Sequence, residues 1–253
     1  MILAIDMGNT NIVIGAIDDK KTYFVERVTT NHSKTDLEYA VNIKSVLEIH
    51  SIPPAEITGG IISSVVPPLN TTLKSAIKKL FGFEPMLVGS GMKTGMNILM
   101  DNPKTVGADM IVDAVAAIKD YSCPIIIIDM GTATTMSVVD PSGNYIGGVI
   151  LPGLKVSLDS LSGKTAQLPY ISLETPGKVI GKNTIDCMRS GIIYGNAAQI
   201  DGIIDRMEQE LGQTASIVAT GGLARLITPI CRHKIVYDDA LLLKGLLTLY
   251  QRN

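Results

Sequence analysis

Two apolar runs in this chain are each followed by nearly the same polar segment. These segments are Ile5-Asp6-Met7-Gly8-Asn9-Thr10 and Ile128-Asp129-Met130-Gly131-Thr132-Ala133, and β-forming residues follow both. An apolar run of about four to six residues predicts a buried strand, and Asp-x-Gly after it predicts a tight turn into a second strand. The pattern therefore predicts a β-hairpin near the start of each half of the chain, within a duplicated architecture.

The first half is expected to follow the order β-β-β-α-β-α. Strands are predicted over 23–28 and 60–66, an irregular segment over 91–103, and a helix over 105–120. A capping box, Thr35 to Glu38, predicts a helix start, and the apolar face of that helix is expected to be Leu37, Ala40, Val41 and Leu47. Another helix is predicted after Pro67-Pro68. A strand that follows a crossover helix pairs in parallel, so the sheet should be mixed.

The second half repeats much of this order. A third strand is predicted over 145–149, with Gly147-Gly148 and Pro152-Gly153 at its end, and a buried strand over 217–220 runs into Gly221-Gly222. The apolar positions Ile193, Ala197, Ile200, Ile204, Met207 and Leu211 recur every three or four residues and predict a long helix. Its stripe is either core packing or, if exposed, a dimer seam. A final helix carries Leu243, Leu246, Leu247 and Tyr250.

The turn residues are suited to holding phosphate. Glycine lets the backbone approach a ligand closely, and neighbouring Asn and Thr residues add side-chain groups to free backbone N–H groups. Asp6 and Asp129 then lie where a metal ion that accompanies phosphate would be. Asp109, just after Gly107-Ala108, falls in the first turn of a predicted helix. From its position alone, Asp109 is either an ordinary helix-start acid or a carboxylate that projects into a site, and both interpretations stay open.

Composition narrows the function classes. Hydrophobic residues make up 46% of the chain, aromatic residues 4%, and tryptophan is absent, while the formal net charge is −2. Such a chain lacks the stacking residues and the basic footprint of a nucleic-acid-binding protein. No apolar stretch reaches membrane length and no signal peptide is recognisable, so a cytoplasmic protein is expected. Three separated cysteines favour reduced thiols, and the three histidines are far apart in the sequence.

Five motifs, in order over nearly the whole chain, carry a family resemblance. They are 6–11, 107–109, 129–135, 147–153 and 181–184, that is DMGNTN, GAD, DMGTATT, GGVILPG and GKNT. The chain resembles type III pantothenate kinase, within the acetate and sugar kinase, Hsp70 and actin superfamily. The resemblance implies an α/β fold of duplicated ribonuclease-H-like (actin-like ATPase) domains, each a mixed five-stranded sheet with helices, with ATP in the interdomain cleft. Expected domains are 1–120 and 121–253.

The resemblance also implies roles for individual residues. The ATP-binding positions are Asp6, Met7, Gly8, Asn9, Thr10, Asn11, Ile12 and Val13, with Thr132 and, near adenosine, Gly221 and Gly222. The pantothenate contacts are Met100, Gly107, Ala108, Asp109, Met110 and Thr184, with Asp109 as catalytic base. Asp129 matches a monovalent cation ligand, K⁺ or NH₄⁺, and Asp6 is expected to bind Mg²⁺, directly or through water. Thr184 would come from the neighbouring subunit of a homodimer.

Three positions depart from the family pattern. Met110 replaces an arginine after the base, Met100 replaces a tyrosine, and Asp239 replaces a proline. The expected reaction is ATP-dependent phosphorylation of pantothenate, the first step of coenzyme A biosynthesis. Two alternatives remain from the sequence: an accessory or regulatory ATP-binding protein with little or no activity, and a superfamily phosphohydrolase in which Asp109 orients water.

Overall fold

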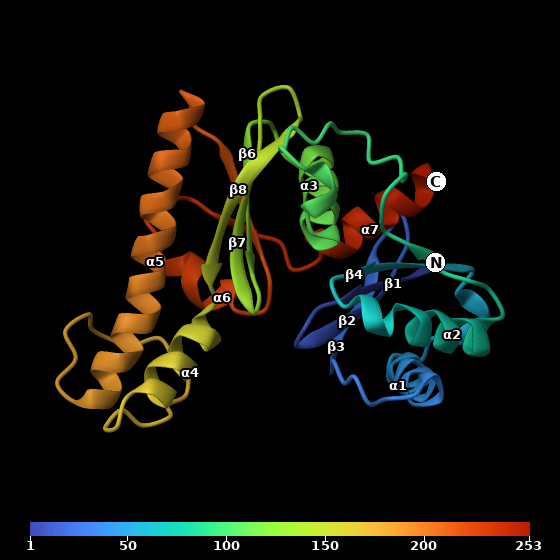
Figure 1. Ribbon diagram of the computed structural model, residues 1–253, viewed down its shortest axis with the longest axis horizontal. Helices are drawn as coiled ribbons and strands as arrows, with labels where there is room; N and C mark the ends of the chain where they lie inside the picture. Colours follow the sequence, from blue (N-terminus) through green and yellow to red (C-terminus); the bar gives the residue numbers. More distant parts are fainter. The chain divides into compact units, whose positions relative to one another are not determined.

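The computed structural model describes all residues, 1–253. The chain forms two compact units. The first comprises Met1–Met96, Asp101–Lys119 and Ala240–Asn253, and the second comprises Asn97–Met100 and Asp120–Asp239. Each unit contains one five-stranded mixed sheet with helices packed on it (Figure 1).

The first sheet has the strand order β3-β2-β1-β4-β5. Its strands are β1 Ile2–Met7, β2 Asn11–Ile17, β3 Thr22–Thr29, β4 Gly59–Ser64 and β5 Met86–Leu87. Its helices are α1 Asp36–Ile49, α2 Asn70–Phe81, α3 Ala108–Asp120 and α7 Leu241–Arg252, with the short 3-10 helices η1 Pro54–Glu56, η2 Pro67–Leu69 and η3 Pro103–Thr105. β1 pairs antiparallel with β2 and parallel with β4, as the predicted order requires.

The second sheet has the equivalent order β10-β9-β6-β7-β8. Its strands are β6 Ile125–Met130, β7 Ala133–Val139, β8 Tyr145–Pro152, β9 Ser216–Thr220 and β10 Val236–Tyr237. Its helices are α4 Leu154–Lys164, α5 Thr184–Leu211 and α6 Ala224–Ile227, followed by η4 Thr228–Ile230. β6 again pairs antiparallel with the next strand and parallel with the strand that follows the helices. The prediction of two mixed five-stranded sheets is confirmed.

Each face of the first sheet has its own core. One core joins β1 residues Leu3, Ile5 and Met7 to α1 and α2, and the other joins Ile2 and Ala4 to α3 and α7. The C-terminal helix therefore belongs to the first unit, where Leu243 and Leu246 are almost fully buried. A division at residue 120 would separate this helix from the sheet that it covers. Its apolar face matched the amphipathic pattern, but that pattern did not indicate which sheet lies beneath it.

Two local predictions were wrong. The capping box at Thr35 is present, but Leu37 and Val41 are exposed, and the buried face of α1 is instead Tyr39, Ala40, Ile43, Val46 and Leu47. Gly147-Gly148 lies inside β8 rather than at its end, because β8 continues to Pro152.

The apolar side chains along α5 pack in the core of the second unit. Ile193, Ile200 and Ile204 are buried against the second sheet and α6, so they do not form a dimer seam. None of the helices combines the length and the apolar character that a membrane-spanning helix requires.

Candidate functional site: two braced hairpins and the start of α3

The β1–β2 hairpin presents an exposed polar turn. Asn9, Thr10 and Asn11 are exposed, and the N–H of Gly8 closes the turn by donating to the carbonyl of Asn11 at 3.0 Å. The residue after β3, Thr30, braces the turn because its N–H donates to the carbonyl of Thr10 at 3.0 Å and its Oγ1 donates to the carbonyl of Gly8 at 2.6 Å. The turn is therefore held in one conformation while its outer side stays accessible.

The β6–β7 hairpin repeats this construction one residue shorter. The N–H of Gly131 donates to the carbonyl of Ala133 at 3.0 Å, and Thr132 is exposed. The residue after β8, Gly153, donates its N–H to the carbonyl of Thr132 at 3.1 Å, the counterpart of the Thr30 brace. A Cβ on Gly153 would lie 2.3 Å from that carbonyl oxygen, so only glycine fits there. The shared sequence of the two turns thus reflects a shared hydrogen-bond frame.

Asp6 lies at the end of β1, on the face that α3 and α7 cover. Side chains alternate along a strand, and Ile2 and Ala4 already pack in the α3–α7 core, so the carboxylate of Asp6 lies on the same face. Asp6 is in register with Ser63 of β4, whose fully buried Oγ has no hydrogen-bond partner in the structure. Ser63 was not singled out from the sequence. A hydroxyl at the end of a buried strand, level with Asp6, was the available signal.

The carboxylate of Asp109 lies at the start of α3, as predicted. It accepts a hydrogen bond from the N–H of Met110 at 2.8 Å, while the first helical bond runs from the N–H of Ile111 to the carbonyl of Gly107 at 3.2 Å. Burial raises the pKa of Asp109 above its ordinary value, and the N–H groups of Met110 and Asp109 itself oppose that shift. A half-buried carboxylate with a raised pKa is a candidate proton acceptor.

The lack of a side chain at Gly107 makes room for the carboxylate of Asp109. A Cβ on Gly107 would lie 2.3 Å from Oδ1 of Asp109 and 3.7 Å from Cγ of Met110. The side chains of Asp109 and Met110 therefore both lie against the glycine. One turn later, Asp113 is 3% exposed, so α3 carries a second and more deeply buried carboxylate below the first.

In the second unit, Asp129 lies against the β9–α6 turn. Gly221 has φ +92°, and a Cβ there would lie 2.7 Å from Oδ1 of Asp129 and 2.7 Å from the carbonyl oxygen of Met130. The backbone of Gly221 thus packs closely against a carboxylate oxygen and a carbonyl oxygen. These are the oxygen donors that hard cations prefer. No group of three or more His, Cys, Asp or Glu side chains converges anywhere in the chain to hold a metal ion.

Met100 and Thr184 both lie in the second unit, at different places. The segment of Met100 adds to the sheet, since the N–H of Leu99 donates to the carbonyl of Tyr145 at 2.8 Å, and the Met100 sulfur lies 3.4 Å from a Cβ built on Gly147. Thr184 is the first residue of α5, capped by Asn183, whose Oδ1 accepts from the N–H of Asp186 at 2.9 Å.

Thr184 borders a shallow apolar depression of about 420 Å³. Its other lining residues are Leu161, Leu168, Cys187, Met188, Gly191 and Ile192. Gly181 packs over the first turn of α5, where a Cβ would lie 2.5 Å from the N atom of Cys187. The GKNT motif therefore consists of a close backbone contact, a cap and an exposed hydroxyl.

Comparison with known proteins identifies the family. The family model described as type III pantothenate kinase matches residues 2–206. Proteins named type III pantothenate kinase from Anaeromyxobacter sp. (strain Fw109-5) and Exiguobacterium sp. (strain ATCC BAA-1283 / AT1b) are 44% and 46% identical to this chain over 253 residues, all of it, covering 100% and 99% of their own lengths.

Solved structures support the fold at low sequence identity. A protein described as a conserved Baf family transcriptional activator from Campylobacter jejuni has a TM-score of 0.61 at 17% identity, covering 99% of this chain and 98% of its own. The activator of 2-hydroxyisocaproyl-CoA dehydratase from Clostridium difficile, solved with bound ADPNP, has a TM-score of 0.54 at 11% identity, covering 98% and 93%. The predicted duplicated ribonuclease-H-like fold is confirmed, and the chain belongs to the type III pantothenate kinase family.

Proposed function

We propose that this chain transfers the γ-phosphoryl group of ATP to the primary alcohol of pantothenate, the first step of coenzyme A biosynthesis. Full-length identity of 44% and 46% to type III pantothenate kinases identifies the reaction. The structural observation that carries it is the half-buried carboxylate of Asp109 at the start of α3, with its pKa raised by burial. The proposed location is the cytoplasm, where ATP is available.

The two hairpins are the proposed phosphate-binding elements. Phosphoryl transfer depends mainly on positioning and charge neutralisation, and rigid backbone N–H groups supply both without reorganising. Residues 6–13 and Thr132 would contact the phosphates, and Gly221-Gly222 would lie beside the adenosine. The two braces, from Thr30 to the first turn and from Gly153 to the second, support this assignment because a preorganised turn loses little entropy when it binds.

Asp109 is the proposed catalytic base. An ionised carboxylate can accept the proton of the pantothenate hydroxyl as that oxygen attacks the γ-phosphorus, and ADP then leaves. Gly107 to Met110 would position the substrate beside the base. Met110 supplies an apolar side chain where the family pattern has an arginine, so the raised pKa of Asp109 is not offset by a positive charge on that residue.

Two cations fit the residues present. Mg²⁺ takes oxygen ligands and usually keeps several waters beside one or two carboxylates and the phosphates of a substrate, so the single carboxylate of Asp6 at a phosphate turn suits it. When bound, Mg²⁺ neutralises charge on the phosphoryl oxygens. K⁺ or NH₄⁺ would lie at Asp129, whose Oδ1 and the neighbouring carbonyl of Met130 are oxygen donors close to the Gly221 turn.

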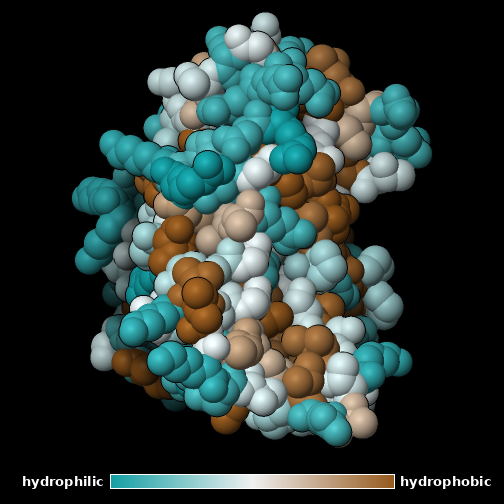
Figure 2. Space-filling view, turned by 90° about the vertical axis from the view of Figure 1, so that its left-hand side faces the viewer, coloured by the Kyte–Doolittle hydropathy of each residue, from teal (hydrophilic) through white to brown (hydrophobic).

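We also propose a homodimer in which Thr184 contacts pantothenate in the partner subunit. Six exposed large apolar side chains lie in α4, in the segment between α4 and α5 and at the start of α5: Val156, Leu161, Tyr170, Val179, Ile180 and Ile185. Figure 2 views the molecule from the side on which α4 and α5 lie in Figure 1, and shows apolar patches among polar residues. Clusters of this kind commonly mark protein interfaces.

The test is an ADP-release assay with ATP, Mg²⁺, a potassium salt and pantothenate. The wild type should release ADP only when pantothenate is present, and Asp109→Asn should lower turnover by about 10²- to 10⁴-fold while ATP affinity changes little. Glu210→Gln, an exposed carboxylate-to-amide change on α5, is the matched control. ADP release without pantothenate would favour a phosphohydrolase. Measurable ATP binding without any turnover would favour an accessory factor.

A further inference from the structure

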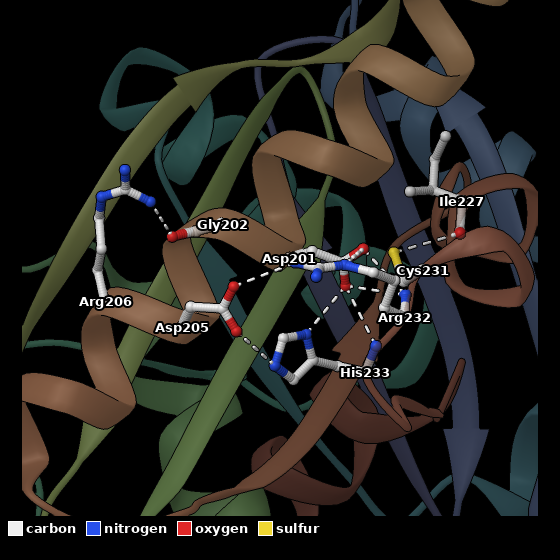
Figure 3. Close-up of polar contacts among 8 residues, drawn as sticks. All are labelled: Asp201, Gly202, Asp205, Arg206, Ile227, Cys231, Arg232 and His233. Atoms are coloured by element: carbon white, nitrogen blue, oxygen red, sulfur yellow. Dashed lines mark hydrogen bonds and ion pairs between the residues drawn. The ribbon is translucent and has the colours of Figure 1, made fainter. Parts of the chain in front are cut away.

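A dense polar cluster ties α5 to the segment after α6 (Figure 3). Asp201 of α5 is only 2% exposed, yet its carboxylate receives N–H groups from Arg232 at 3.0 and 2.9 Å and from His233 at 3.2 Å. Both N–H groups belong to the backbone. A buried charge is tolerated when hydrogen bonds satisfy it, and these bonds lower the pKa of Asp201 although burial alone would raise it.

The imidazole of His233 lies between two carboxylates. Its Nδ1 is 3.0 Å from Oδ1 of Asp201 and its Nε2 is 3.1 Å from Oδ1 of Asp205, one turn along α5. An ionised carboxylate only accepts hydrogen bonds, and a neutral imidazole has a single N–H, so only the doubly protonated ring donates to both. Arg232 adds a charge-assisted bond to Oδ2 of Asp205 at 3.1 Å.

The other polar side chains near His233 have partners of their own and make no hydrogen bond with its ring. Cys231 donates its thiol to the carbonyl of Ile227 at 3.4 Å, and burial together with the charge of Asp201 raises its pKa to about 12, so it stays protonated. Arg225 of α6 pairs with Asp239 at 3.6 Å, and Arg206 of α5 donates to the carbonyl of Gly202. The ring therefore faces two acids and one cation, the side chain of Arg232.

The cluster anchors one end of a loop whose other end is the Gly221 turn. From Gly221 the chain passes through α6, whose Ala224 and Ile227 are fully buried, and through η4 to Cys231. α5 packs against both α6 and η4. The bond from Cys231 to Ile227 joins the anchored segment to the end of α6. The anchored residues 231–233 are thus connected through α6 to the Gly221 turn, which lies against Asp129.

We propose that Asp201, Asp205 and His233 are positioning residues for the nucleotide: together they hold the 221–233 loop so that Gly221-Gly222 keeps its place beside Asp129. The inference rests on the proposed function in one respect, the assignment of adenosine to this turn. None of the three residues touches the reacting atoms. Their loss should therefore weaken ATP binding and leave the chemical step and pantothenate binding nearly unchanged.

The first experiment compares Asp201→Asn, His233→Gln and the control Glu210→Gln. The KM for ATP should rise between about 2- and 30-fold in the first two, the range expected when coupling through a packed network is lost. kcat and the KM for pantothenate should stay within about twofold of wild type, and Glu210→Gln should change none of them. If Asp201→Asn does not fold, the kinetic constants of His233→Gln alone test the proposal. An unchanged KM for ATP, or equal losses in all three constants, overturns the proposal.

The second experiment compares Asp205→Asn with Asp205→Ala. The amide that Asp205→Asn introduces can still contact Nε2 of His233 while its oxygen accepts from Arg232, whereas Asp205→Ala removes both contacts. The KM for ATP should therefore stay near the wild-type value in Asp205→Asn and rise in Asp205→Ala. Equal KM values for ATP in the two variants overturn the role of Asp205 in holding the ring.

A third measurement separates this inference from the proposed function. Amide hydrogen exchange in the protein without ligands should be faster over residues 221–235 in Asp201→Asn and His233→Gln than in wild type and Glu210→Gln. This readout does not depend on the identity of the phosphoryl acceptor. Wild-type protein that binds ATP but ignores pantothenate contradicts the proposed function alone, whereas unchanged exchange over 221–235 contradicts the positioning role alone.

Discussion

Gly107 and Asp109 are fitted to each other: the carboxylate Oδ1 of Asp109 occupies a place only 2.3 Å from where a Cβ of residue 107 would lie. The backbone just before α3 thus leaves room for the side chain of the candidate base. A glycine two residues before the base is needed for this local reason.

Gly107→Ala should lower kcat by about 10- to 100-fold with little loss of fold stability. The added methyl group displaces the carboxylate rather than the backbone, and a shift of about 1 Å in a catalytic group can cost 10²-fold. Steady-state kinetics and the melting temperature would measure the two effects. Gly89→Ala is the control, because a Cβ there meets nothing closer than the carbonyl oxygen of Leu87 at 4.0 Å. Wild-type kcat in Gly107→Ala would show that the carboxylate position is not critical.

The pH dependence of turnover should reveal the raised pKa of Asp109. The base must be ionised, so activity falls as pH drops through its folded pKa, which lies above the ordinary 3.8. Met110→Arg puts a cation beside the carboxylate, favours its charged form, and should move the acid limb of the kcat/KM profile to lower pH. Met110→Leu serves as the uncharged control. An acid limb in the same place for both variants would mean that the residue 110 side chain points away from the base.

Asp109→Asn should be at least as stable as wild type at neutral pH. Because burial raises the folded-state pKa of Asp109, the folded protein binds this proton more tightly than the unfolded chain does. That contribution is fully present below the unfolded pKa and is lost as pH rises through the folded pKa. An amide does not ionise, so the variant avoids the loss. Melting temperatures at pH 4 and pH 7 would test this, and a lower value for the variant at pH 7 would refute it.

Gly221→Ala should weaken both stability and potassium activation. Its φ of +92° strains any residue with a Cβ, a cost of about 1–3 kcal/mol, and the methyl group would also clash with Oδ1 of Asp129 at 2.7 Å. Gly143→Ala isolates the first effect, because its φ is +79° and nothing lies within 4 Å of the added Cβ. Turnover titrated with KCl against NaCl is the measurement. An unchanged potassium response in Gly221→Ala would place the cation elsewhere.

Mixed dimers should restore activity if sites are shared. Asp109→Asn and Thr184→Ala chains, each weak alone, would form heterodimers in which one of the two sites has both residues intact. Activity after subunit exchange should exceed that of either parent, with exchange confirmed by differently tagged chains. No recovery in confirmed heterodimers would mean that Thr184 serves its own subunit or none.

The repeated parts of the molecule were predictable because their patterns are local. Asp-x-Gly after an apolar run predicted both hairpins, and alternation of helices and strands predicted the two mixed sheets. Asp109 was placed in the first turn of α3 because a helix start is coded by neighbouring residues. The ATP, cation and pantothenate roles of individual residues remain predictions.

What escaped prediction depends on contacts between distant segments. Asp201 and His233 are 32 residues apart, and no local pattern indicates that a buried acid and a histidine would meet across that distance. Leu37 and Val41 fit an apolar stripe on α1, yet Tyr39 and Ile43 take the buried face because the neighbouring α2 and the first sheet decide which side is covered. The roles of Ser63 and Gly153 likewise depend on distant neighbours: Ser63 pairs in register with Asp6, and Gly153 donates to the carbonyl of Thr132.

The packing of α7 has a consequence for how this protein is made. α7 is translated after the whole of the second unit, yet Leu243 lies so close to Gly15, and Tyr250 to Gly59, that a Cβ on either glycine would clash with it. The first sheet emerges first during synthesis, but one of its faces is covered by α3 alone until α7 is made. Domains commonly fold in order from the N-terminus as they are translated. The unit that carries Asp6 and Asp109 is therefore begun first and completed last. A chain that stops near residue 240 would contain the whole second unit but would lack α7, so its first unit would be incomplete.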